Sequence, residues 1–182
     1  MPINHSSKYS ELTDEQFSLI GKLMIEFSNI DFLLGILLSR LLFTPEFLGR
    51  TYSDQMMVTK KIDGIENALD IHINRYGYKI IPKQTIEKST ELIREIKGIK
   101  NLRNKFAHYC WSRWNDNEIF GSKISGSLPN EKKPNKEDIS ITNTELISHY
   151  KKAYSIVERI EEIINQIPKF EENIELIKKT LK

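Results

Sequence analysis

The chain has 182 residues, of which 39% are hydrophobic and 29% are charged, and its formal net charge is +2. This composition excludes a disordered chain, and the length predicts a single domain over residues 1–182 with a core of its own. The single cysteine, Cys110, excludes an intrachain disulfide and a Cys-x-x-Cys zinc site, which favours a cytoplasmic protein.

The first predicted helix follows a polar N-terminal stretch. Residues 1–12 have no apolar segment of the kind found in a signal peptide and predict a flexible tail. The sequence Thr-Asp-Glu-Gln, from Thr13 to Gln16, is a capping box. We expect a helix from this box to about Phe43, where Thr44-Pro45 ends it.

The most apolar run of the chain lies in this first helix, at residues 32–43. It is shorter than the ~18 residues of a membrane span and contains Arg40. We therefore predict a buried core helix and no membrane partner.

Two further helices are expected before the middle of the chain. The second begins near Ser53 and ends around Tyr76-Gly77, because glycine suits a left-handed helix cap. The third begins after Gln84 or Thr85 and continues to about Arg113.

The segment 114–141 is rich in glycine, proline and polar residues and predicts a long loop, with a short β-hairpin through residues 118–125 as an alternative. A second capping box, Thr142 to Glu145, begins a fourth helix that reaches Ile167. Pro168 separates it from a short last helix. The predicted fold class is all-α, an up-down bundle of four to five helices with the long loop or hairpin between the third and fourth long helices.

One charged residue interrupts the apolar stripe of each of two helices. Asp31 does so on the first helix and Arg103 on the third. Because buried charges are costly unless paired, we expect Asp31 and Arg103 to face each other. Such a pair can serve only to fix helix register, or Asp31 can orient Arg103 towards a phosphate. The stripes comprise Phe17, Ile20, Met24, Phe27, Leu34 and Leu38 on the first helix, and Leu92, Ile96, Ile99, Phe106 and Cys110 on the third.

The segment from Arg103 to His108 carries the residues best suited to chemistry. Asn104 and His108 are four residues apart and share a helix face, off the apolar stripe. Histidine can exchange protons near neutral pH, and arginine can stabilise the charge of a phosphorane. Residues 85–113 contain seven Lys or Arg against three Glu. Together these residues predict RNA cleavage through the 2′-hydroxyl without a metal or cofactor.

The candidate RNA contacts are Lys100, Lys105 and Trp111, although packing in the core or at an interface is the alternative for Trp111. Arg103 and His108 are five residues apart, which is about 140° around an ideal helix, so one helix aims them poorly at one phosphate. A two-fold homodimer with a composite site would resolve this difficulty.

The stretch from Leu102 to Trp111, LRNKFAHYCW, resembles the signature of the HEPN superfamily (higher eukaryotes and prokaryotes nucleotide-binding). Phe27 to Gly35 is similar to the first helix of that family, with Asp31 at its acidic position. The resemblance implies a metal-independent ribonuclease of a toxin–antitoxin or phage-defence system, often dimeric, with an antitoxin or defence-complex partner. It implies that Arg103 and His108 are catalytic and that Asn104 assists.

One position departs from a subgroup of this family. The subgroup paired with nucleotidyltransferase antitoxins has tyrosine two residues after the histidine, where this chain has Cys110. Two hypotheses of other classes stay open beside the ribonuclease: a non-catalytic helical binding module, and a structural dimerisation domain. We expect no function for the lone histidines His72 and His149, and a packed thiol at Cys110.

Overall fold

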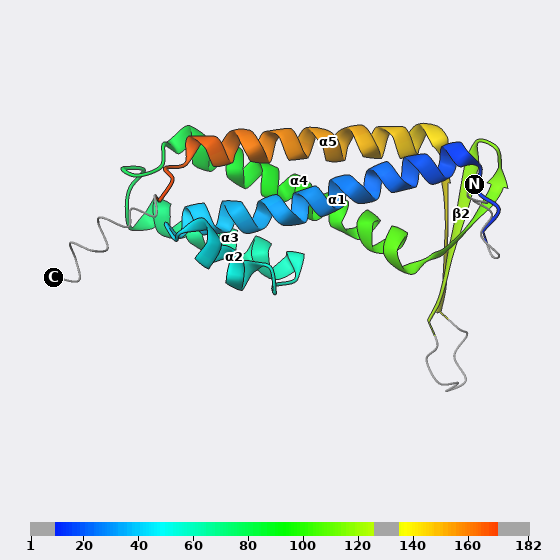
Figure 1. Cartoon of the computed structure of the whole chain (residues 1–182), viewed down its shortest axis with the longest axis horizontal. Coiled ribbons are helices and arrows are strands. Elements are labelled where there is room, and N and C mark those ends of the chain that lie inside the picture. Colours follow the sequence, from blue (N-terminus) through cyan, green and yellow to red (C-terminus); the bar gives the residue numbers. More distant parts are fainter. Residues whose placement is uncertain (1–9, 126–134, 171–182) are drawn as a thin grey trace. The chain divides into compact units, whose positions relative to one another are not determined.

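The protein is predominantly helical, as predicted. The computed structural model describes residues 10–125 and 135–170. Five helices and three strands follow one another within these residues (Figure 1). They are α1 (Asp14–Leu41), α2 (Glu46–Ser53), α3 (Val58–Asn74), α4 (Lys83–His108), β1 (Cys110–Asn115), β2 (Glu118–Ser125), β3 (Asn135–Thr142) and α5 (Asn143–Gln166).

Most of the predicted tail and the predicted short last helix lie outside the described residues. Within them, no helix combines the length and the apolar character that a membrane crossing would need.

Both predicted capping boxes are confirmed. At the start of α1, the Thr13 N–H donates to Gln16 Oε1 (3.0 Å) and the Gln16 N–H donates to Thr13 Oγ1 (3.2 Å). At the start of α5, the Thr142 N–H donates to Glu145 Oε2 (2.8 Å) and the Glu145 N–H donates to Thr142 Oγ1 (3.2 Å). Hydrogen bonds from Thr142 lower the pKa of Glu145. Each box satisfies free backbone donors of the first helical turn.

The largest difference from the predicted helix boundaries in the first half of the chain concerns the second helix. The predicted second helix is preceded by the separate short helix α2, and α3 begins only at Val58. Gly77 has a φ of +57°, which agrees with the predicted glycine in the turn after this helix.

The described residues of the predicted long loop, 114–125 and 135–141, belong mainly to a three-stranded antiparallel sheet in the order β1-β2-β3. β2 coincides with the segment 118–125, where a hairpin was the alternative. α4 ends at His108, five residues before the predicted end, because the chain from Cys110 onwards pairs with β2. Backbone groups that would have continued the helix are satisfied by cross-strand hydrogen bonds.

Contacts divide the chain into two compact units, and α1, α4 and α5 each contribute residues to both. The first unit takes the described residues of Met1–Ser28 and Lys97–Ser155, and the second takes those of Asn29–Ile96 and Ile156–Lys182. The single domain therefore stays a prediction. The core of the first unit includes Leu19, Leu23, Phe27, Ile99, Phe106, Ile119, Ile141 and Leu146, and that of the second includes Leu34, Leu37, Ile62, Ile65, Ile86, Leu92, Ile93 and Ile160.

An aromatic stack joins the sheet to the end of α4 within the first unit. The Trp111 ring lies on Phe106, with ring centroids 4.7 Å apart and planes 18° from parallel. Gly121 is the cross-strand partner of Trp111. A Cβ atom at Gly121 would lie 2.7 Å from Trp111 Cζ3, so only glycine leaves room for this indole.

We expect Gly121→Ala to lower the free energy of unfolding by about 1–3 kcal/mol, because the added methyl group overpacks the contact with Trp111. The matched control is Gly98→Ala, since Gly98 is an exposed glycine within α4 and a Cβ there meets nothing within 4 Å. That control should gain up to about 1 kcal/mol from helix propensity. Urea denaturation measures both, and equal stability of Gly121→Ala and wild type would contradict the packing.

Candidate functional site

The last turns of α4 and the strands that follow it position the candidate site. His108 is the final residue of α4 and is exposed. The Tyr109 N–H still donates to the Lys105 carbonyl (3.0 Å), and the chain then becomes extended at Cys110. Lys105 and His108 occupy the last helical turn, where the helix dipole favours positive charge.

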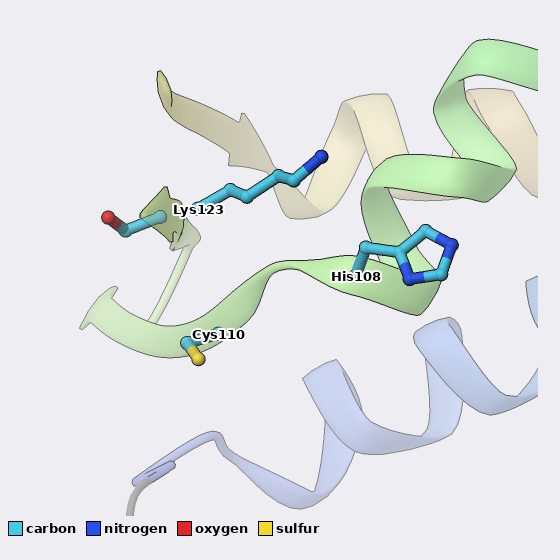
Figure 2. Close-up of a pocket in the computed structure, with 4 residues that line it drawn as sticks. His108, Cys110 and Lys123 are labelled. Atoms are coloured by element: carbon cyan, nitrogen blue, oxygen red, sulfur yellow. The ribbon is translucent and has the colours of Figure 1, made fainter. Parts of the chain in front are cut away.

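Two hollows in the surface share His108 and Lys123 as lining residues. We call them the His108 hollows. The first has a volume of about 580 Å³ and is lined by His108, Cys110, Ser122 and Lys123 (Figure 2). The second has a volume of about 740 Å³ and is lined by Asn101, Asn104, Lys105, His108, Tyr109, Lys123 and Asp138.

The structure brings three of the predicted site residues together. Asn104, Lys105 and His108 line the same hollow, as expected from their spacing on one helix. His108 is exposed, which agrees with its predicted position off the apolar stripe.

Arg103 is placed differently from the prediction. It is exposed, and its Nη1 donates to the Asn104 Oδ1 over 3.4 Å. It does not line either His108 hollow. Phe106 is buried beneath Trp111, but the Arg103 position, one turn earlier on the same helix, is open to solvent.

Asp31 has a partner other than the predicted Arg103. Asp31 Oδ1 lies 2.6 Å from the Nζ of Lys61, a residue of α3. Lys61 is the buried partner, with 3% of its side chain exposed, and its Nζ also donates to the Asp31 carbonyl (3.1 Å). The buried charge is therefore that of Lys61 on α3, where the sequence pattern did not predict one. Arg103 is exposed to solvent and needs no carboxylate partner.

Three other sequence-based expectations have mixed outcomes. Trp111 is half-buried against Phe106 and Gly121, which is the packing alternative, and its role in RNA binding stays a prediction. Cys110 was expected to be a packed thiol on the helical stripe. It is exposed on β1, because the helix ends before it. Lys100 is half-buried and does not line either His108 hollow.

The sheet supplies site residues that sequence reasoning missed. Lys123 comes from β2 and Asp138 from β3, and both lie in the segment predicted to be a loop. Ser122 pairs with Cys110 on one side and with Asp138 on the other, which brings the three strands to the end of α4. The alternation of polar and apolar residues from Asp138 to Thr142 in β3 was the available signal for a strand, and the hairpin alternative covered only residues 118–125.

The charge of the His108 hollows is mainly positive. Lys105 and Lys123 contribute two ammonium groups, and Asp138 contributes one carboxylate. Asn101 and Asn104 add amide groups that can donate to an oxygen ligand. Such a set of donors fits a phosphate group, because ammonium and amide N–H groups both hydrogen-bond to phosphate oxygens.

The histidines His72 and His149 do not line the His108 hollows. His72 is buried, and its Nε2 lies 2.9 Å from the Leu41 carbonyl, which accounts for this lone histidine. Burial also lowers the pKa of His149. In the described part of the chain, no group of three or more His, Cys, Asp or Glu side chains is arranged to hold a metal ion.

Comparison with known proteins does not assign the chain to a family. No family model, curated protein or solved structure matches it. The resemblance to the HEPN superfamily rests on the residues between Leu102 and Trp111 and on the stretch around Asp31.

Proposed function

We propose that this protein is a metal-independent endoribonuclease of the HEPN type and that the His108 hollows are its active site. The observation that carries the proposal is the meeting of His108 with Lys105, Lys123 and Asn104 around one surface depression. An exposed imidazole beside two ammonium groups combines a proton-transfer group with groups that hold a phosphate.

The chemistry assigns a role to each group. The 2′-hydroxyl oxygen of the RNA attacks the adjacent phosphorus and loses its proton, and the bond to the 5′-oxygen breaks as that oxygen gains a proton. His108 takes up the first proton or supplies the second. Lys105 and Lys123 bind the phosphate and stabilise the negative charge of the phosphorane, and Asn104 donates to it. The products are a 2′,3′-cyclic phosphate and a free 5′-hydroxyl.

Arg103 enters this scheme through a second copy of the chain. Because its guanidinium does not line the His108 hollows of its own chain, a two-fold dimer would let one chain supply Arg103 and the other supply His108. The toxin or phage-defence role in the cytoplasm, with an antitoxin or defence-complex partner, is the biological setting that the resemblance implies.

The proposed activity is tested by incubating the purified protein with 5′-labelled total RNA in EDTA. Cleavage should persist and leave 2′,3′-cyclic phosphate or 3′-phosphate ends, and DNA of the same sequence should stay intact because it lacks the 2′-hydroxyl. Activity that EDTA abolishes and magnesium restores would contradict the mechanism.

Mixing two inactive variants tests the composite site. If Arg103 and His108 act from different chains, Arg103→Ala and His108→Ala chains should regain about a quarter of wild-type activity at equal concentrations. Half of the randomly mixed dimers then contain both variants, and each of these has one intact site of two.

Native mass spectrometry verifies that the two variants have exchanged chains. The cleavage activity of the mixture can then be interpreted. Restored activity supports a site shared between chains. No restoration in exchanged dimers, or a strictly monomeric active enzyme in light scattering, would contradict it.

The second candidate function is a non-catalytic RNA-binding module. The position of Arg103 outside the His108 hollows favours it, because Lys105, Lys123 and Asn104 can hold a phosphate without an arginine on the reacting group. Tight RNA binding without any cleavage would support this alternative.

A further inference from the structure

The sheet of β1, β2 and β3 has a buried side and an opposite, outer face. Ile119 and Gly121 are buried and, with Trp111, belong to the core side. Because side chains alternate along a strand, the intervening residues point to the opposite face. This outer face carries Cys110 paired with Ser122, then Ser112 paired with Phe120, then Trp114 where the register shifts.

Trp114 is the exposed aromatic residue of this outer face. Its side chain is 70% exposed, and its ring centroid lies 6.1 Å from that of half-buried Phe120, with a 42° tilt. The other tryptophan, Trp111, is stacked on Phe106 and has one ring face covered. Of the two tryptophans, Trp114 is therefore the more exposed to a ligand.

The outer face continues directly from the proposed active site. The first cross-strand pair, Cys110 with Ser122, lines the smaller His108 hollow. The pair Ser112 with Phe120 lies two residues further along β1, a step of roughly 7 Å at about 3.4 Å per strand residue. Figure 2 shows the start of this path, with Cys110 on β1 beside His108 and Lys123.

The charges along the outer face indicate where the reacting phosphate and the bases of an RNA strand would lie. Lys105 and Lys123 line the His108 hollows and suit the phosphate that reacts. The two acidic residues that follow Trp114 in the sequence, Asp116 and Glu118, have partners. Asp116 accepts from Arg113 (3.4 Å), and Glu118 accepts from Asn115 (3.3 Å) and from Ser140. A base can therefore stack on Trp114 without facing an unpaired carboxylate among these residues.

We propose that the outer sheet face is a stacking platform for single-stranded RNA, on which a base beyond the two that flank the cleaved linkage lies against Trp114 and Phe120. The proposal rests on the proposed function, because it identifies the substrate as a single strand longer than two nucleotides. Stacking on an exposed aromatic ring tolerates any base, so the platform gives affinity and placement without sequence readout. A duplex is excluded from it, since its bases are already stacked and paired.

Substrates of two lengths separate the platform from the active site. The dinucleotide UpU engages the His108 hollows alone, whereas an oligouridylate of eight nucleotides also reaches Trp114. Trp114→Ala should lower kcat/KM on the longer substrate roughly tenfold and leave kcat/KM on UpU unchanged. Trp114→Phe should retain most of the wild-type value, because a phenyl ring still stacks. The matched control is Tyr52→Ala, which removes an equally exposed aromatic side chain from α2.

Fluorescence measures the same contact without cleavage. In the Trp111→Phe chain, Trp114 is the only tryptophan. Titration with 2′-O-methyl oligouridylate of eight nucleotides, which cannot be cleaved through a 2′-hydroxyl, should quench its emission. The Kd of this oligonucleotide, measured by anisotropy, should rise about tenfold in Trp114→Ala.

The outcomes distinguish the two proposals. One outcome is that wild type cleaves UpU, and that Trp114→Ala and Tyr52→Ala both have the wild-type kcat/KM on the longer substrate. This outcome overturns the platform and leaves the ribonuclease proposal standing. If nothing is cleaved but the oligonucleotide quenches Trp114 and binds Trp114→Ala more weakly, the platform stands and the ribonuclease fails. An oligonucleotide that binds without changing Trp114 emission also overturns the platform.

Discussion

Replacement of His108 with alanine is expected to abolish RNA cleavage and leave the fold unchanged. His108 is exposed at the end of α4 and lines both His108 hollows, so its removal creates no cavity in the core. A general acid or base contributes about 10²–10⁴-fold to a reaction rate, and a loss of that size in kcat is expected. RNA binding should persist, because Lys105 and Lys123 remain.

The matched control for this experiment is Arg94→Ala, which removes an exposed residue of the same helix outside the proposed site. It should cut RNA at the wild-type rate. Circular dichroism and urea denaturation establish that both variants are folded. If His108→Ala cuts as fast as Arg94→Ala, the active site is misassigned, and a kcat loss without a change in RNA affinity supports the proposed role.

Truncation of Asp31 is expected to give a large loss of stability. Asp31→Ala leaves the ammonium group of Lys61, which is 3% exposed, without its carboxylate. Breaking a buried ion pair typically costs about 3–5 kcal/mol. We expect a value near the lower end, about 3 kcal/mol, because the Asp31 side chain is 42% exposed and Lys61 retains the Asp31 carbonyl as an acceptor.

A double-mutant cycle separates this ion pair from simple truncation. Asp31→Ala combined with Lys61→Met should recover most of the lost stability, because the methionine buries no charge. The matched control is Asp63→Ala, which removes one partner of the exposed pair with Lys60 (3.8 Å) and should change stability by less than about 1 kcal/mol. Urea denaturation of wild type, Asp31→Ala, Lys61→Met and the double variant gives the coupling energy, and a value near zero would refute the pair.

The pairing with Lys61 also bears on what Asp31 is expected to do. The charge of Asp31 stabilises α1 against α3 within the second unit, through Lys61. Its role as an orienting group for Arg103 stays a prediction. The catalytic proposal now rests on His108 and the groups around it.

The features that the sequence determined by itself are local. The two capping boxes formed as predicted because each joins residues three apart, and no distant segment is needed. The shared face of Asn104 and His108 follows in the same way from helical spacing. The helical class and the buried stretch around Leu34 and Leu37 follow from apolar patterns long enough to favour helices.

The features that only the tertiary structure decided depend on residues far apart in the chain. Cys110 to Asn115 could continue a helix on local pattern alone, but pairing with β2 makes this segment a strand. That pairing exposes Cys110, covers Trp111 and brings Lys123 and Asp138 to His108. The partner of Asp31 was likewise decided by packing, because a helical wheel places a charge on a face without saying which helix covers that face.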